Sequence, residues 1–198
     1  MADVSVQQIQ ELRKKTGAGM MDSKKALTNA KGDMKKAVIL LREKGLAGLE
    51  KRADREVKEG VIDSYIHSNG KIGVLVEVNC ETDFVARNDK FQQFVHDVAL
   101  QIAASNPLFV TEDDVPEDAL KGERKIYAAQ AKKSGKPDNV IEKIVEGKLK
   151  KYYEEVVLLN QPFVKNPDLT IKDYLGDLAA SLGENVKIRR FVRLELGQ

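Results

Sequence analysis

The sequence has few of the residues on which metal and covalent chemistry usually depend. Its 198 residues include one cysteine, Cys80, and two histidines, His67 and His96. A single cysteine excludes an internal disulfide framework and any metal site built from several cysteines, and it fits a reducing cytoplasm. The histidines and the cysteine show no metal-ligand spacing such as HxxxH or CxxC. We therefore expect neither a metal nor a cofactor.

Long apolar runs and targeting features are also missing. No run approaches the roughly 18–20 apolar residues that a membrane-spanning helix needs, so we expect a soluble protein without a membrane partner. A helix-start signal lies within the first six residues, which leaves no room for a signal-peptide h-region or an Arg-rich presequence. With the single cysteine, this predicts a cytoplasmic protein.

Charges of both signs are abundant but unevenly distributed. Residues 1–59 hold 14 Lys and Arg against 9 Asp and Glu, whereas residues 60–198 hold 19 against 22. A balance of +5 with interleaved acids is far from that of a polyanion-binding tail. Lysine pairs occur along the chain, but such pairs usually lie on solvated helix faces, so direct nucleic-acid binding is not expected.

The first 49 residues predict a small bundle of three helices. Each segment carries one apolar stripe, and short amphipathic helices bury their stripes against one another. The expected caps and stops are Ser5 and Gly17, Asp22 and Ala30, and Asp33 and Gly45. The charged stretch over residues 50–59 has no apolar periodicity and is interpreted as a linker.

From residue 60 to residue 198 the pattern predicts an α+β core domain. Two runs rich in β-branched residues, 61–67 and 72–80, flank the turn signal Ser68-Asn69-Gly70 and predict a hairpin. The second run has apolar residues on both faces, which predicts a central strand. A third strand is expected near the C-terminus, with Val186, Ile188, Val192 and Leu194 on one face. Helical stripes between these runs complete a three-stranded antiparallel sheet covered by helices.

Two motifs are not explained by core packing alone. Met20 and Met21 are expected between two helices, where they either plug the small core or contact a protein partner. Phe84 and Asp83 follow directly where the second strand ends. An aromatic residue at such a turn is either a lid on the core, which the pattern favours, or an anchor for a partner. A thiol enzyme built from Cys80, His67 and Asp83 is not expected, because no spacing links these residues.

These motifs resemble signatures of the bacterial translation elongation factor Ts family. Residues 16–27 (TGAGMMDSKKAL) resemble the N-terminal signature, and residues 78–86 (VNCETDFVA) resemble a second one. Four further blocks, 135–137, 146–151, 161–164 and 183–190, resemble family blocks in the same order. The resemblance covers nearly the whole chain and implies a ubiquitin-associated-like three-helix module followed by an α+β core.

The resemblance implies a guanine-nucleotide exchange factor for elongation factor Tu, the GTPase that carries aminoacyl-tRNA. Such a factor performs no covalent chemistry and binds both the GDP-bound and the nucleotide-free GTPase. Because it prefers the nucleotide-free form, it weakens nucleotide binding by the same coupling free energy. The turn formed by Thr82, Asp83, Phe84 and Val85 would enter the partner near its Mg²⁺. Phe84 would act there as a wedge, and Asp83 would disturb the surroundings of the ion.

The remaining site residues also follow from the resemblance. Arg13, Met20 and Met21 match positions by which the N-terminal module holds the GTPase. Leu182 and Gly183 match a core loop that faces the partner, and His67 matches a hairpin residue that does likewise.

One departure from longer family members concerns the number of core halves. Those members carry two related halves and a helical protrusion, whereas one hairpin and one C-terminal strand here make a single half. A C₂ homodimer would supply the second half. Two other functions stay open from the residues alone: an adaptor without exchange activity, and an RNA-associated protein that uses the lysine pairs.

Overall fold

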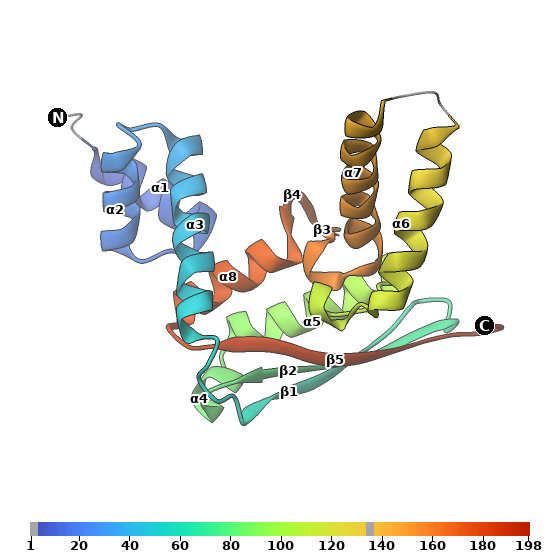
Figure 1. Ribbon diagram of the computed structural model, residues 1–198. Helices are drawn as coiled ribbons and strands as arrows, with labels where there is room; N and C mark the ends of the chain where they lie inside the picture. The colour runs from blue at the N-terminus through green and yellow to red at the C-terminus, as the bar shows by residue number, and fades with distance from the viewer. Residues whose placement is uncertain (1–3, 134–136) are drawn as a thin grey trace. The chain divides into compact units, whose positions relative to one another are not determined.

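The computed structural model describes residues 4–133 and 137–198 and has the predicted α+β composition (Figure 1). The chain forms two compact units: Met1–Leu100 with Lys172–Gln198, and Gln101–Ile171. The predicted division into residues 1–49, 50–59 and 60–198 stays a prediction. No helix in the described residues is both long and apolar enough to span a membrane.

The N-terminal residues form the predicted three-helix bundle. Its helices are α1 (Val6–Thr16), α2 (Met20–Asn29) and α3 (Met34–Arg52). The capping box at α1 is present: the Ser5 hydroxyl accepts the Gln8 N–H at 3.2 Å, and the Gln8 side-chain oxygen accepts the Ser5 N–H at 3.0 Å. The buried side chains that hold the bundle together are Ile9, Leu12, Ala26, Leu27, Ala30, Ala37 and Leu41.

Two predicted helix ends in the bundle are wrong. Helix α2 begins at Met20, and Asp22 lies in its first turn, where a carboxylate also favours the positive end of the helix dipole. Helix α3 does not stop before Gly45 but continues to Arg52, into the expected linker. A Cβ at Gly45 would lie 3.1 Å from the Gly176 carbonyl oxygen, so this glycine permits close helix packing rather than ending the helix.

The sheet of the first unit consists of β1 (Glu59–Ile66), β2 (Ile72–Cys80) and β5 (Val186–Glu195). The strands are antiparallel in the order β1-β2-β5, which confirms the predicted central position of β2. Figure 1 shows helices α5 (Asp89–Ser105) and α8 (Ile171–Leu182) on the same side of the sheet. The buried side chains of β2 and α5 that form this core are Val74, Val76, Val78, Phe91, Phe94, Val95 and Val98.

A β-bulge in β5 overturns the predicted facing of that strand. Ile188 lies opposite Val78 and Arg190 lies opposite Glu77, so Arg189 is an extra residue. One inserted residue reverses which face each later side chain occupies. Val186 and Ile188 are buried as expected, but the later apolar residues predicted to share their face are exposed.

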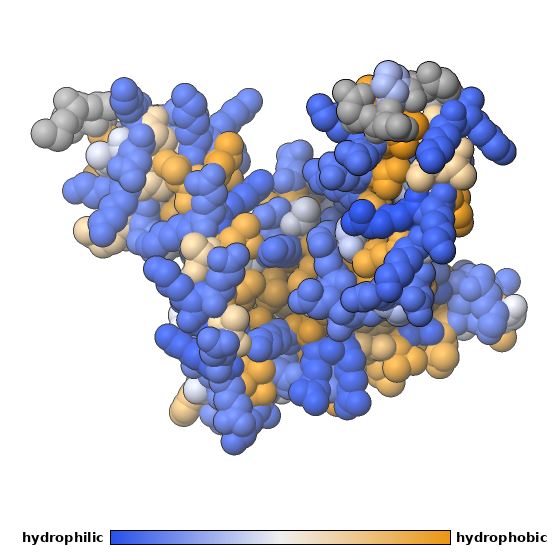
Figure 2. Space-filling view, in the orientation of Figure 1, coloured by the Kyte–Doolittle hydropathy of each residue, from blue (hydrophilic) through white to orange (hydrophobic). Residues whose placement is uncertain are grey.

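Within the first unit, α5 and α8 cover one face of the sheet. The other face, here called the outer sheet face, carries six exposed apolar side chains from the three strands and the residue after β5. They are Ile62, Ile66, Leu75, Val192, Leu194 and Leu196. Figure 2 shows apolar side chains gathered below β5 toward its C-terminal end. A patch of this kind commonly marks an interaction surface.

The second unit contains the helices α6 (Glu117–Lys132) and α7 (Asp138–Val156) and a small two-stranded sheet of β3 (Pro162–Phe163) and β4 (Asn166–Thr170). Short 3-10 turns lie at Glu112–Asp114 and Leu158–Asn160. The α6–α7 pair shares a core of Ala131, Ile141, Val145 and Leu149. Pro116 and Pro137 are the N-cap residues of these two helices. Gly135 and Lys136 of one resemblance block lie outside the described residues.

Candidate functional site

The turn that follows β2 displays one aromatic ring to solvent. Residues 81–86, here called the Phe84 turn, include the short helix α4 (Asp83–Ala86). The Thr82 hydroxyl caps this helix by accepting the Val85 N–H at 3.4 Å. The Phe84 side chain is 80% exposed, whereas Val85 and Ala86 are buried. The interpretation of Phe84 as a lid on the core is therefore wrong, and Val85 is the residue that anchors the turn.

Asp83 lies beside the exposed ring. Its carboxylate pairs with the Arg87 guanidinium at 3.0 Å, one helical turn further along. The Asp83 and Arg87 side chains are 46% and 77% exposed. A pair of this kind contributes little to stability, so Asp83 can exchange its partner at low cost. The turn thus presents an aromatic wedge and a carboxylate together.

A carboxylate from a distant part of the sequence holds the Phe84 turn. One oxygen of Glu184 accepts the N–H groups of Glu81 and Thr82, each at 3.1 Å. Its other oxygen accepts the Thr82 hydroxyl at 2.7 Å. Glu184 can reach the turn because Val186 pairs with Cys80 across β5 and β2, so the loop before β5 lies beside the end of β2.

A second carboxylate makes the reciprocal contact. Glu81 accepts the backbone N–H of Asn185 at 2.6 Å and the Arg55 guanidinium at 3.3 Å. The Asn185 side-chain amide in turn donates to the Arg55 carbonyl at 3.0 Å. Polar contacts thus join the 182–185 loop to the Phe84 turn and to the segment before β1.

Cys80 is buried directly beneath this network. Its thiol donates to the Thr82 carbonyl at 3.2 Å. Burial raises the pKa of the Cys80 thiol to about 11, and the negative charge of Glu184 acts in the same direction. A nucleophilic cysteine needs the opposite, an exposed site that favours the thiolate. The thiol therefore has a packing role.

The expected loop residues lie beside the Phe84 turn, but His67 does not. Leu182 ends α8 half-buried, and Gly183 is exposed with a φ of 76° that favours glycine. His67 is exposed at the hairpin-turn end of the sheet, where its ring nitrogen contacts the Tyr65 hydroxyl at 3.2 Å. Cys80 lies at the far end of β2. The eight residue steps of that strand separate the two ends by roughly 27 Å.

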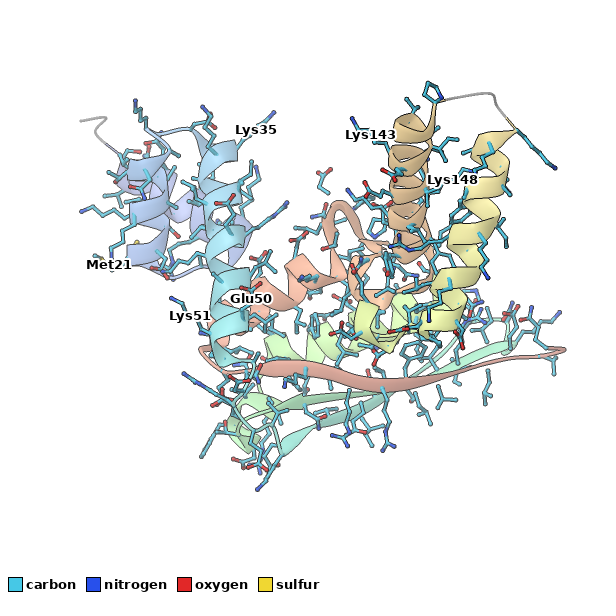
Figure 3. All side chains as sticks on the ribbon, in the orientation of Figure 1. Met21, Lys35, Glu50, Lys51, Lys143 and Lys148 are labelled. Atoms are coloured by element: carbon cyan, nitrogen blue, oxygen red, sulfur yellow. The ribbon has the colours of Figure 1, made fainter. Side chains whose placement is uncertain are left out.

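The expected contact residues of the bundle are all exposed. Arg13 lies on α1, and Met20 and Met21 begin α2 with 43% and 64% of their side chains exposed. Figure 3 shows Met21 at the N-terminal end of α2, directed away from the bundle. Neither methionine belongs to the bundle core. The alternative in which they plug this core is therefore wrong.

The positions that sequence reasoning missed are the residues that hold the turn. They are Glu81, Glu184, Asn185 and Arg55. A signal was present for two of them, since Glu81 directly precedes Thr82 and Glu184 precedes the strand that pairs with β2. Their pairing could not be predicted, because it depends on the register of β2 and β5.

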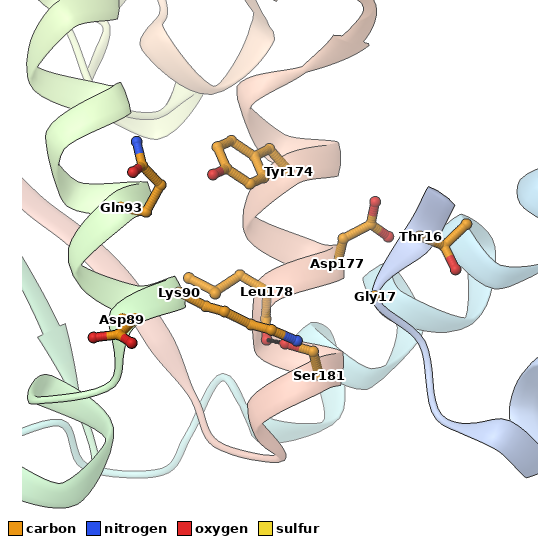
Figure 4. A pocket seen from close by; sticks show the side chains of 9 residues that line it. All are labelled: Thr16, Gly17, Asp89, Lys90, Gln93, Tyr174, Asp177, Leu178 and Ser181. Atoms are coloured by element: carbon orange, nitrogen blue, oxygen red, sulfur yellow. Dashed lines mark hydrogen bonds between the residues drawn. The ribbon is translucent and has the colours of Figure 1, made fainter. Parts of the chain in front are cut away.

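A hollow of about 400 Å³ lies between α1, α5 and α8 (Figure 4). Lys90 and Asp177 point into it from α5 and α8 in Figure 4. Burial raises the pKa of the Asp177 carboxyl to about 6; Arg42 opposes this shift and Asp173 adds to it. In residues 4–133 and 137–198, no three His, Cys, Asp or Glu side chains are grouped to hold a metal ion.

Comparison with known proteins gives matches along the whole described chain. A family model described as Elongation factor TS matches residues 4–198. The elongation factor Ts of Carboxydothermus hydrogenoformans is 56% identical over 195 residues, which cover 98% of this chain and 90% of that relative. The elongation factor Ts of Desulfosudis oleivorans is 54% identical over 198 residues, the full length of both chains. The matched residues include every element of the candidate site.

Proposed function

Because this chain belongs to the elongation factor Ts family and is thus a translation elongation factor, we propose that it is the guanine-nucleotide exchange factor for elongation factor Tu. It acts in the cytoplasm by binding the GDP-bound GTPase, releasing GDP and stabilising the nucleotide-free form. It performs no covalent chemistry. The buried thiol of Cys80 and its separation from His67 agree with this assignment.

The observation that carries the proposal is the exposed ring of Phe84 on an anchored turn. A large apolar side chain held 80% exposed loses contact with its own core and gains contact only with a partner. An aromatic ring suits insertion because few rotatable bonds are frozen when it binds. The caps and carboxylates around it keep the backbone of the turn in place.

The wedge acts on the metal site of the partner. Mg²⁺ requires near-ideal octahedral geometry and bridges the phosphates of a bound nucleotide. A small displacement of the groups around the ion therefore weakens nucleotide binding. Phe84 separates side chains near that site, and the Asp83 carboxylate disturbs the environment of the ion. Thr82 and Val85 support these two residues from within the turn. By reciprocity, tight binding of the nucleotide-free GTPase lowers nucleotide affinity by the same factor.

Other exposed residues provide the rest of the contact. Arg13, Met20 and Met21 hold the GTPase domain from the bundle, and Met side chains adapt well to a partner surface. Leu182 and Gly183 extend the surface around the Phe84 turn. His67, at the opposite end of β2, provides a second and separate contact.

Release of labelled GDP from purified elongation factor Tu tests the assignment directly. We expect catalytic amounts of this protein to accelerate release in the presence of excess unlabelled nucleotide. Binding without acceleration would instead identify an adaptor. Binding to RNA that weakens steeply with salt, with no effect on GDP release, would identify an RNA-associated protein.

The outer sheet face supports the further proposal that two copies form a C₂ homodimer. A two-fold interface brings one patch against itself, so the patch must not carry unbalanced charge. At one end of this face Glu77 pairs with Arg190 at 2.7 Å and with Arg189 at 3.5 Å, so one carboxylate offsets part of the charge of two guanidinium groups, and we expect the two-fold contact to lie over the apolar remainder. The remainder carries the six exposed apolar side chains. Two sheets packed through these faces would give the two core halves of longer family members.

A further inference from the structure

We propose that Glu184 is a positioning residue for nucleotide exchange, which holds the Phe84 turn rigid while the ring enters the partner. The inference rests on the proposed exchange function. It assigns a role to a residue that lies outside the turn itself and reaches it through hydrogen bonds from the loop before β5.

Glu184 lies where the pairing of β2 and β5 ends. Cys80 and Val186 are the last residues that pair between β2 and β5. The next two backbone donors of the chain, the N–H groups of Glu81 and Thr82, have no strand to bind. The Glu184 carboxylate accepts both N–H groups at 3.1 Å. Its side chain thus takes the place of a strand partner just beyond the end of β2. Bonds to an ionised acceptor are stronger than those between neutral groups.

The hydroxyl that Glu184 contacts is also the hydroxyl that caps α4. The Thr82 oxygen donates its hydrogen to Glu184 at 2.7 Å and accepts the Val85 N–H at 3.4 Å. Ionised Glu184 has no hydrogen to donate, so it fixes the direction of the Thr82 hydroxyl and leaves an oxygen lone pair for Val85. The carboxylate therefore orients the Thr82 hydroxyl that caps α4, the helix that carries Phe84.

The exposed ring acts on a partner through the backbone that carries it. A wedge displaces groups in a partner only if its own backbone does not yield first. If the turn were flexible, part of the binding free energy would be used to order the turn rather than to lower the affinity of the GTPase for its nucleotide. Loss of Glu184 should therefore affect the exchange step more than binding, because the bundle contacts are unchanged.

The kinetic test uses Glu184→Ala and Glu184→Gln in the full chain. We expect Glu184→Ala to lower the maximal rate of GDP release about tenfold while the half-saturating concentration changes less than about twofold. Glu184→Gln keeps one acceptor oxygen for the backbone N–H groups and should restore the rate to within about threefold of wild type. Glu154→Ala, which removes an exposed carboxylate from α7, is the matched control and should have no effect.

A double variant separates positioning from general stability. Once Phe84→Ala has removed the wedge, adding Glu184→Ala should change the rate less than about twofold, because nothing remains to be positioned. A full additional loss in the double variant would show a merely structural role and overturn the proposal. A wild-type rate for Glu184→Ala alone would also overturn it.

Amide hydrogen exchange in the isolated protein tests the same contacts without the GTPase. Glu184→Ala should accelerate exchange at residues 81–86 and leave the rest of β2 protected. Unchanged exchange there would overturn the proposal even if GDP release slowed. If wild-type protein failed to accelerate GDP release, the proposed function would fail and this role with it, and the amide result would still show whether Glu184 orders the turn.

Discussion

Phe84 and Val85 show what a sequence can and cannot determine for single residues. Both belong to the motif that resembles the family signature, yet one is 80% exposed and the other is buried. The motif identified the segment, but exposure depends on how the short helix α4 is set on the end of β2. That setting comes from Thr82 and from Glu184, which lies 102 residues after Thr82 in the sequence.

Asp83 is the residue for which an internal and an external role can be separated by mutation. We expect Asp83→Ala to lower the maximal rate of GDP release about tenfold, because the carboxylate that disturbs the Mg²⁺ environment is lost. Arg87→Gln removes only the internal ion pair, which is exposed and contributes little. It should therefore leave the rate within about twofold of wild type.

Stopped-flow release of fluorescent GDP measures both variants, with unfolding midpoints as the control for folding. Equal losses in Asp83→Ala and Arg87→Gln would assign the effect to the ion pair and contradict the external role of the carboxylate.

At the scale of whole elements, caps and periodicity predicted where most helices and strands lie. They failed where a tertiary contact decided the outcome. Helix α3 passes through Gly45 because that glycine packs on Gly176 of α8. The facing of β5 reverses at Arg189 because a bulge inserts one residue. Neither contact leaves a signal in the local sequence.

Gly45→Ala tests the packing of α3 on α8. The new Cβ would lie 3.1 Å from a backbone oxygen of Gly176 that cannot move alone, so we expect a net loss of about 1 kcal/mol in unfolding free energy. The matched control is Gly122→Ala in α6, where nothing lies within 4 Å of the new Cβ. This change should stabilise the chain by about 0.5–1 kcal/mol through helix propensity.

Denaturant titrations of both variants give the comparison. Stabilisation by Gly45→Ala of the same size as by Gly122→Ala would show that α3 and α8 do not pack closely at these glycines.

Asp177 on α8 should give a pH-dependent contribution to stability. Burial raises its pKa to about 6 in the folded protein, so the folded state binds a proton more tightly than the unfolded state between about pH 4 and pH 6. The unfolding free energy that depends on Asp177 therefore falls as pH rises through this range. Asp177→Asn, which imitates the protonated form, should be more stable by about 1–2 kcal/mol at pH 7 and nearly equal to wild type near pH 4.

Unfolding titrations at several pH values measure this difference. A constant difference between Asp177→Asn and wild type across the range would show that Asp177 does not carry the pH dependence.

For the whole molecule, ordered motif blocks in the sequence indicated the family, whereas no pattern in it determined the assembly. The expectation of a sheet covered by helices holds for one face, and the bulge in β5 adds the apolar side chains of that strand to the outer sheet face. A simple alternating pattern had placed Val192 and Leu194 with the buried residues, which concealed this surface.

Leu75→Lys tests the outer sheet face as a homodimer interface. Leu75 lies on the central strand, so a two-fold interface would bury two added charges near its middle. We expect wild-type protein to sediment as a dimer at micromolar concentration and Leu75→Lys to sediment as a monomer with an unchanged far-ultraviolet spectrum. Ile126→Lys, at an exposed apolar position of α6, should remain dimeric. A monomeric wild-type protein would contradict the homodimer.

The exposed ring of Phe84 is proposed to drive nucleotide release, so the decisive quantity is the maximal rate of GDP release by Phe84→Ala. The matched control is Leu108→Ala, which shortens another apolar side chain that is 61% exposed. We expect Phe84→Ala to lose at least about tenfold in maximal rate while still binding the GTPase through the bundle, and Leu108→Ala to match wild type. A folded Phe84→Ala variant that releases GDP at the wild-type rate would contradict the account.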